Sequence, residues 1–317
     1  MARYRSQLPQ LGGKLFLTDG GMETTLIFHE GVELPYFASF VLLETEEGIA
    51  RTRRYYERYI ALAKANGFGF VLETPTWRAN RDWAHKLDYD AERLASINRR
   101  AVELMTTLRD EHATPGTPMV VSGNIGPRGD GYVADTAMSA REAADYHGEQ
   151  IATFGDTDAD YVSAFTLNYV EEAIGITQAA STANMPVVIS FTVETDGRLP
   201  TGQALGDAVT EVDSVSGRKP AYYMINCAHP THFRDALNSG DDWVQRVRGV
   251  RANASRRSHA ELDAAPDLDA GDPVEFGALH GELLRMLPHL TVLGGCCGTD
   301  DRHVAHVCQA CAPAAAT

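Results

Sequence analysis

The sequence predicts a single (β/α)8 barrel, and three observations support this fold class. Apolar runs of strand length alternate with amphipathic segments of helix length along the whole chain, which is typical of parallel βα units. Eight such units can be counted, and 317 residues is a usual length for a closed eight-stranded barrel. No linker or abrupt change of composition divides the chain, so we expect one domain over residues 1–317.

The first half of the chain supplies four of the βα units. Strands are expected over residues 14–18, 68–72, 118–122 and 160–166, and helices over about 45–66, 90–111 and 139–155. Gly67 is predicted to end the first helix, because glycine readily adopts the left-handed conformation of a C-cap. Ser139, with Glu142 three residues later, has the pattern of a capping box and predicts the start of the third helix.

The second half supplies the other four units with weaker helix signals. Strands are expected over residues 186–193, 221–227, 247–253 and 290–293. Helices are expected through residues 171–174 and over about 201–213, 275–287 and 303–312. The segment 254–273 is rich in Asp and Ala and is predicted to be a polar loop.

Polar residues follow every predicted strand, although the strand bodies are apolar. They are Asp19, Glu73, Asn124, Thr166, Glu194, Cys227, Asn253 and the pair Cys296–Cys297. In (β/α)8 barrels the functional residues lie at the carboxyl ends of the strands. We therefore expect these side chains to gather at one end of the barrel.

The segment Gly294–Gly298, Gly-Gly-Cys-Cys-Gly, places two adjacent cysteines directly after the last strand. Both thiols can serve one site only where the strand breaks into a turn, and the glycines permit that turn. Neighbouring cysteines are poorly placed to bridge each other, and a chain without an export signal is expected to keep its thiols reduced. A shared zinc ion is the leading use for Cys296 and Cys297, and a catalytic zinc takes three protein ligands.

Cys227, at the end of the sixth predicted strand, is the best candidate for the third ligand. Cys308 and Cys311 compete for this role as a Cys-x-x-Cys pair, although they lie in the predicted closing helix. They would make a closed structural zinc site with Cys296 and Cys297. The plainer interpretation of Cys308 and Cys311 is that they fill space in the core, as buried free cysteines often do.

Composition excludes several classes of partner. The net charge of −15 argues against nucleic acid and anionic membrane surfaces. No stretch approaches 18 apolar residues, and no apolar run follows the basic residues at the N-terminus, so we expect a cytoplasmic protein. The eleven histidines show no metal-binding pattern. Oligomeric state is not encoded in any pattern of the sequence.

Zinc held by three thiolates carries a negative set of ligands and is therefore a poor Lewis acid. Its better use is to bind a substrate thiol in the fourth position and keep it ionised at neutral pH while it remains nucleophilic. Alkylation of a thiol is thus the reaction that this ligand set favours.

The motifs resemble those of the homocysteine S-methyltransferases, which include betaine-dependent and S-methylmethionine-dependent enzymes and the homocysteine module of cobalamin-dependent methionine synthase. The resemblance covers nearly the whole chain. The matching segments are Thr18–Gly21, Glu73–Thr76, Gly123–Pro127, Ser190–Phe191, Asp196–Leu199, Asn226–Cys227 and Gly294–Thr299. It implies a (β/α)8 barrel that moves a methyl group to homocysteine and gives methionine.

The resemblance also implies a set of site residues. Cys227, Cys296 and Cys297 would be the catalytic zinc ligands. Asp19 and the backbone of Gly20 and Gly21 would hold the amino-acid end of homocysteine, because a carboxylate suits an ammonium and free backbone N–H groups suit a carboxylate. The remaining substrate-binding residues implied in this way are Glu73, Thr74 and Asn226.

One departure from the family concerns the fourth strand, where Phe165 stands in place of a glutamate that often helps to bind the substrate ammonium. Glu73 or Glu194 would have to compensate for that loss. Trp77, Tyr132 and Phe165 are expected to line a pocket for a cationic methyl donor through cation–π contacts.

The expected partners are a small-molecule thiol and a free methyl donor, with S-methylmethionine or S-adenosylmethionine ahead of betaine. The departure at Phe165 leaves a second hypothesis, in which the same zinc barrel methylates or demethylates a different thiol. A third hypothesis is a non-catalytic protein with a structural zinc site.

Overall fold

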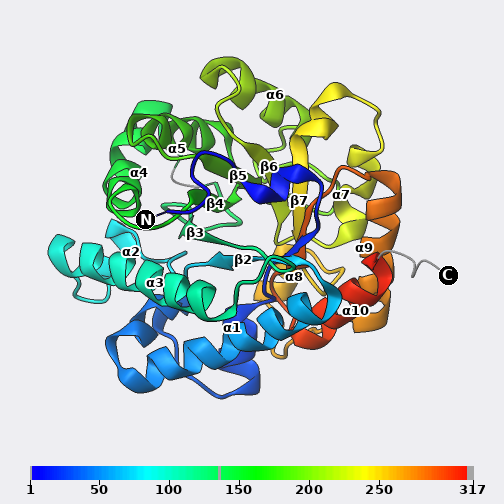
Figure 1. Ribbon diagram of the computed structural model, residues 1–317. Helices are drawn as coiled ribbons and strands as arrows, with labels where there is room; N and C mark the ends of the chain where they lie inside the picture. Colours follow the sequence, from blue (N-terminus) through cyan, green and yellow to red (C-terminus); the bar gives the residue numbers. More distant parts are fainter. Residues whose placement is uncertain (1, 135–136, 313–317) are drawn as a thin grey trace.

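The structure is a computed structural model that describes residues 2–134 and 137–312. Eight parallel strands close into a barrel in sequence order, and the helices surround them (Figure 1). The predicted fold class and all eight strands are confirmed. The strands are β1 (Phe16–Leu17), β2 (Gly69–Glu73), β3 (Met119–Ile125), β4 (Tyr161–Leu167), β5 (Val187–Phe191), β6 (Tyr222–Asn226), β7 (Val247–Ala252) and β8 (Val292–Gly295).

The longer helices agree with the sequence patterns, and several short elements join them. The α-helices are α1 (Glu46–Asn66), α2 (Arg81–His85), α3 (Ala91–His112), α4 (Ala140–Gly155), α5 (Val170–Thr182), α6 (Leu205–Ser216), α7 (Pro230–Leu237), α8 (His259–Asp263), α9 (Pro273–Met286) and α10 (Asp301–Cys311). Short turns of 3-10 or π helix are η1 (Pro9–Gly12), η2 (Thr24–His29), η3 (Pro35–Phe37), η4 (Ser39–Glu44) and η5 (Asp242–Arg246).

Two helix ends agree with the sequence patterns, and a third helix start was not predicted. Gly67 adopts φ 65° and ψ 23° and ends α1. Ser139 and Glu142 form the predicted capping box of α4. The prediction of an unbroken loop over residues 254–273 is wrong, because Ser258 and Glu261 form a second capping box that starts α8.

The barrel interior is apolar towards the amino ends of the strands. Alternate strand residues face inwards, and an interior cluster includes Phe16, Val71, Tyr161, Tyr222 and Val292. The N-terminal segment, dark blue in Figure 1, closes this end: Leu8 packs in the same cluster, and Gln10 Nε2 donates to the Tyr222 hydroxyl at 3.3 Å.

Towards the carboxyl ends of the strands the interior becomes polar. Two residues beyond Val71 and Tyr161, the same inward alternation reaches Glu73 and Ser163, which are hydrogen-bonded to each other at 2.7 Å. The inward positions of β6 and β7 there are Asn226 and Arg251, both buried. Polar groups inside a protein need partners, so this end of the barrel is where a ligand site is expected. Among the described residues, no helix is long and apolar enough to cross a membrane.

Candidate active site

Three cysteine sulfurs meet at the carboxyl ends of β6 and β8. The Sγ atoms of Cys227, Cys296 and Cys297 all lie within 4.8 Å of one another. Cys227 and Cys296 are joined as a disulfide, with Cα atoms 5.4 Å apart, while Cys297 is free and exposed. The barrel thus brings two cysteines that are 69 residues apart in the sequence into direct contact. A metal at these sulfurs requires the reduced form.

The backbone at the ends of β4 and β6 is strained, and one amide side chain holds both strands. Thr166 and Cys227 have φ of 62° and 55°, values that non-glycine residues rarely adopt. Asn226 Oδ1 accepts from the Thr166 N–H at 2.9 Å and from the Ser190 hydroxyl at 2.6 Å, while its Nδ2 donates to Thr166 Oγ1 at 2.9 Å. Asn226, predicted to bind substrate, is thus engaged within the chain and ties the end of β6, next to Cys227, to β4 and β5.

A second group of contacts surrounds the thiols from the side of α8. His259 Nε2 lies 2.6 Å from the carbonyl oxygen of Cys227, and its Nδ1 lies 3.3 Å from Glu194. The His259 ring packs on Tyr132, with ring centroids 4.2 Å apart. The Tyr132 hydroxyl in turn lies 3.6 Å from Cys297 Sγ. His259 was not predicted as a site residue, although the capping box of Ser258 and Glu261 that starts its helix is visible in the sequence.

Asp19 lies in this end of the barrel, but its carboxylate already has partners. Oδ1 accepts from Arg251 Nη2 at 2.7 Å, and Oδ2 accepts from the Tyr55 hydroxyl at 2.9 Å. Neither side chain was singled out from the sequence. A carboxylate paired with a guanidinium has little remaining attraction for a second cation, which weakens the expectation that Asp19 binds the substrate ammonium.

The two glycines after Asp19 differ in their contacts, and only the N–H of Gly21 has a hydrogen-bond partner among the described residues. The Gly21 N–H donates to the Thr299 carbonyl at 3.1 Å, and the Gly20 carbonyl accepts from the Tyr55 hydroxyl at 3.0 Å. A Cβ at Gly21 would stand 2.6 Å from the Cys296 carbonyl oxygen. These glycines therefore allow β1 and the cysteine turn to approach closely.

Glu73 and Thr74 end β2 in different situations. Glu73 is 2% exposed, and its Oε2 accepts from the Ser163 hydroxyl at 2.7 Å. Its Oε1 has no hydrogen-bond partner in the described part of the chain. Burial raises the pKa of Glu73 above its ordinary value. Thr74 Oγ1 is taken up by Thr76 at 2.7 Å and by the Asn124 N–H at 2.8 Å, so Thr74 supports the loop after β2.

Glu23 is a further carboxylate of the site that the sequence analysis did not single out. Burial raises its pKa, a hydrogen bond with Ser39 opposes the rise, and its charge acts on both Asp19 and Arg251. Burial raises the pKa of the Cys297 thiol, and the charge of Glu23 also acts to raise it. Glu23 follows the two glycines in a turn, where no sequence pattern distinguishes it from a solvated residue.

The three aromatic residues predicted for a donor pocket are not equally available. Tyr132 contacts the thiols. One face of Trp77 carries the Arg78 guanidinium, 4.1 Å from the ring centroid. The Phe165 ring, 4% exposed in β4, lies 5.2 Å from the Arg251 guanidinium. Two of the three rings thus already have a cation of the chain beside them.

Cys308 and Cys311 lie on α10 and pack in the hydrophobic core. Burial raises the pKa of Cys308 to about 12 and that of Cys311 to about 11, so both thiols stay protonated at neutral pH. Over residues 2–134 and 137–312, the one group of three or more possible ligands consists of Cys227, Cys296 and Cys297. A closed zinc site built with Cys308 and Cys311 is not formed.

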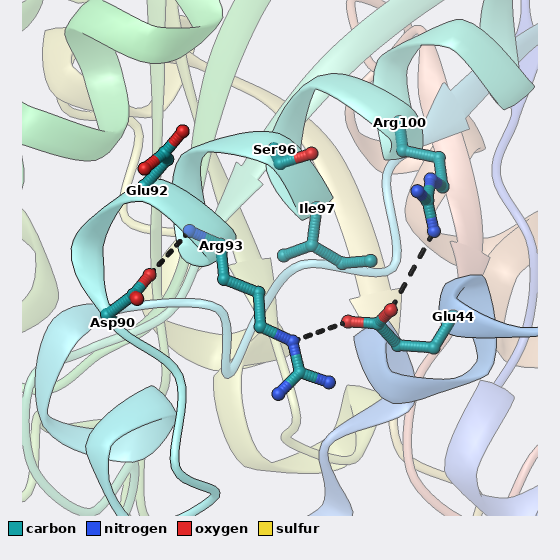
Figure 2. Close-up of a pocket in the computed structure, with 7 residues that line it drawn as sticks. All are labelled: Glu44, Asp90, Glu92, Arg93, Ser96, Ile97 and Arg100. Carbon is teal, nitrogen blue, oxygen red and sulfur yellow. Dashed lines mark hydrogen bonds and ion pairs between the residues drawn. The ribbon is translucent and has the colours of Figure 1, made fainter.

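Two surface hollows lie away from the thiols. The first, about 330 Å³, is framed by charged residues, and Arg93 and Arg100 reach across it to Glu44 at 3.1 and 3.8 Å (Figure 2). The second, about 570 Å³, is lined by residues of 196–210 and 236–243. Neither contains a cysteine or one of the polar strand-end residues predicted for the site.

The three reduced thiols suit a zinc ion. Tetrahedral zinc binds thiolates at about 2.3 Å, which sets its sulfur ligands roughly 3.8 Å apart. The three sulfurs lie within 4.8 Å of one another, and in the reduced form Cys227 and Cys296 would be free to separate to that spacing. No fourth Cys, His, Asp or Glu ligand joins them among the described residues, so a position would remain for a substrate thiol.

Comparison with solved structures agrees with the barrel. The metallated form of the homocysteine methyltransferase MmuM from Escherichia coli matches with a TM-score of 0.72 and 18% identity, over 94% of this chain and 96% of that one. Its oxidized form matches with a TM-score of 0.71 and 20% identity, over 93% and 95% of the two chains. At this identity the likeness supports the fold.

Comparison of sequences gives the family. Methionine synthases of Mycobacterium leprae and Mycobacterium tuberculosis are 27% and 26% identical, over 96% of this chain. The chain spans about a quarter of their length. The family model for homocysteine S-methyltransferases matches residues 16–311, nearly the whole barrel. The chain therefore belongs to the homocysteine S-methyltransferase family.

Proposed function

We propose that this barrel transfers a methyl group from a small cationic donor to the thiol of homocysteine and that Cys227, Cys296 and Cys297 hold the zinc ion that the reaction needs. The observation that carries the proposal is the meeting of these three sulfurs at the carboxyl end of the barrel in a member of this family. Zinc bound there would lower the pKa of the acceptor thiol, so that a thiolate is present at neutral pH.

The surrounding residues support the transfer in distinct ways. Asn226, next to Cys227 in the chain, ties the end of β6 to Thr166 and Ser190. Glu73 offers a free buried oxygen to the acceptor ammonium, in place of the engaged Asp19. Tyr132, whose hydroxyl lies 3.6 Å from Cys297 Sγ, offers an aromatic ring near the thiols to a cationic donor such as S-methylmethionine or S-adenosylmethionine.

The chemical balance of the step is simple. The acceptor loses its thiol proton on binding, the thiolate sulfur forms a bond to the methyl carbon, and the bond from that carbon to the donor's cationic sulfur or nitrogen breaks. The electron pair goes to the leaving group, which becomes neutral. Because the site must be reduced, we propose that the protein works in a reducing compartment such as the cytoplasm.

A screen of donors against acceptors on reduced, zinc-loaded protein tests this proposal. S-methylmethionine, S-adenosylmethionine and betaine are each combined with homocysteine, and methionine is measured. We expect at least one donor to give methionine and the Cys297→Ala variant to give none. Absence of methionine with all three donors, from protein that retains one zinc per chain, would contradict the proposed reaction.

A second candidate is the same transfer to a different thiol. The observation that favours it is the pairing of Asp19 with Arg251 beside Phe165, which leaves less negative charge for an ammonium than the resemblance implied. The same screen separates the two candidates if thiols lacking the ammonium group are included as acceptors.

A further inference from the structure

Arg251 is the least expected residue of the site. It lies on β7, faces the barrel interior and is 8% exposed. Its Nε donates to the Gly295 carbonyl at 3.1 Å, directly before Cys296, and its Nη2 donates to Asp19 at 2.7 Å and to the Gly20 carbonyl at 3.2 Å. The guanidinium is therefore fixed in place beside the cysteine turn.

The remaining nitrogen of the guanidinium is free to bind a ligand. Among residues 2–134 and 137–312, Nη1 of Arg251 has no hydrogen-bond partner. Guanidinium groups carry donors in a planar fork that matches a carboxylate. A rigid, partly satisfied guanidinium at the end of a barrel is suited to a small anion.

The surroundings limit where such an anion can lie. The Phe165 ring lies 5.2 Å from the guanidinium carbon. Asp19 occupies the Nη2 side. The main chain of Arg251 also belongs to the site, because its carbonyl accepts from the Cys227 N–H at 3.1 Å. The charge of Arg251 also acts on the Cys297 thiol, so an anion on Nη1 would lie at the same end of the barrel as the thiols.

Other buried polar atoms without partners gather at the same end of the barrel. They include Glu73 Oε1, Asn124 Oδ1 and Asn253 Oδ1, all at or after the carboxyl ends of strands. These three atoms are acceptors, and the guanidinium of Arg251 lies at the same end of the barrel as a cationic donor. The set is complementary to a molecule that carries both an anionic group and hydrogen-bond donors.

We infer that Arg251 determines acceptor specificity by binding the carboxylate of the acceptor thiol through its free Nη1, while Asp19 holds the guanidinium rather than the substrate. This inference rests on the proposed function, because it concerns the acceptor of that reaction. It assigns the acceptor to the thiol-bearing carboxylic acids and removes Asp19 from direct contact with the ammonium.

Three thiols that differ in one group each test this assignment. Homocysteine has both charged groups, 4-mercaptobutyrate lacks the ammonium, and 3-mercaptopropylamine lacks the carboxylate. Binding to reduced, zinc-loaded protein is measured by calorimetry without any methyl donor. We expect the wild-type protein to bind 3-mercaptopropylamine about 10- to 100-fold more weakly than homocysteine, because charged hydrogen bonds contribute about 1.5–3 kcal/mol. Equal affinity for these two thiols would overturn the inference without any variant.

Substitutions at Arg251 test whether this residue binds the carboxylate of the thiol. Arg251→Gln should weaken homocysteine and 4-mercaptobutyrate about 10- to 100-fold and leave 3-mercaptopropylamine within about twofold. Arg251→Lys should give an intermediate loss, because it keeps the charge and loses the fork. Arg248→Gln is the matched control on the same strand, since Arg248 bonds the His289 carbonyl instead. Equal weakening of all three thiols by Arg251→Gln would assign a purely structural role.

A substitution at Asp19 tests whether its carboxylate holds Arg251 or binds the ammonium of the acceptor. Asp19→Asn should leave the affinity for 3-mercaptopropylamine unchanged, whereas a large loss for this thiol would show that Asp19 itself binds the ammonium and would overturn the inference. If Arg251→Gln does not fold, the double variant Asp19→Asn/Arg251→Gln removes both buried charges and takes its place. Failure of the reaction screen with intact thiol discrimination would contradict the proposed function alone, and methionine formation without discrimination would contradict the inference alone.

Discussion

At the scale of single residues, the five cysteines divide into two groups with different surroundings. Cys227, Cys296 and Cys297 share one cluster of sulfurs at the carboxyl end of the barrel, whereas Cys308 and Cys311 are buried in the core on α10. The chemistry of a thiol follows from whether it can ionise. The pKa of the second pair is raised by burial, so these two cysteines are suited to packing and not to metal binding.

Zinc content should therefore depend on the first group alone. Each of Cys227→Ser, Cys296→Ser and Cys297→Ser should reduce the bound zinc of reduced protein from one per chain to well below stoichiometric. The variant Cys308→Ser should retain it fully. Elemental analysis after dialysis against a weak chelator measures both. Full zinc in Cys227→Ser would show that the metal, if bound, lies elsewhere.

At the scale of elements, glycine has opposite effects at the end and in the middle of a helix. Gly67 ends α1 in the left-handed conformation, with φ 65°, whereas Gly148 lies within α4, and a Cβ at either position would meet nothing within 4 Å. Space is thus equal at the two positions, and only the backbone conformation differs. A side chain costs about 1–2 kcal/mol in the left-handed region, while alanine favours a helix interior by about 1 kcal/mol over glycine.

Gly67→Ala should accordingly lower the free energy of unfolding by about 1 kcal/mol, and Gly148→Ala should raise it by about the same amount. Urea denaturation followed by circular dichroism measures both variants against the wild-type chain. A loss of stability in Gly148→Ala would mean that this face of α4 is constrained by something other than helix propensity.

The short helix α8 explains why His259 was not predicted as part of the site. The prediction of a loop over residues 254–273 rested on composition, whereas the structure starts α8 at a capping box and thereby places His259 against Cys227 and Tyr132. A helix of five residues has too few positions for a periodic pattern. Its cap was the one local signal available.

At the scale of the whole molecule, buried histidines make stability depend on pH. His280 in α9 is fully buried, and burial lowers its pKa to about 4; His229, before α7, is lowered to about 4 in the same way. In the unfolded chain both titrate near 6.5. The unfolded state therefore binds more protons below pH 6.5, and stability is lost as pH falls from about 6.5 towards 4.

Metal-free protein should lose about 2 kcal/mol of stability per buried histidine between pH 7 and pH 5. His280→Asn keeps a donor for the Phe276 carbonyl, which lies 2.8 Å from Nδ1, and removes the titration. Its loss between the two pH values should be smaller by about that amount. Parallel pH profiles for wild-type and His280→Asn protein in urea denaturation would exclude His280 as the source.

Several features of this protein were determined by local sequence. Apolar runs of strand length alternate with amphipathic segments of helix length, and this alternation predicts eight βα units. The barrel confirms all eight strands. Gly67 and Ser139 end and begin their helices through short-range backbone preferences. The positions of Cys227, Cys296 and Cys297 after strands predicted their meeting, because parallel strands in a barrel share one carboxyl end.

Only the tertiary structure decided which side chains contact each other across the barrel. Arg251 meets Asp19 from 232 residues away. The closing of β8 onto β1 and the inward alternation of β7 bring the two together, and no pattern within either segment encodes that pairing. The same holds for the amide of Asn226 between two strained strand ends and for the bridge between Cys227 and Cys296. Residue types and strand ends are local properties, whereas which groups remain free for a ligand depends on every neighbour that the fold supplies.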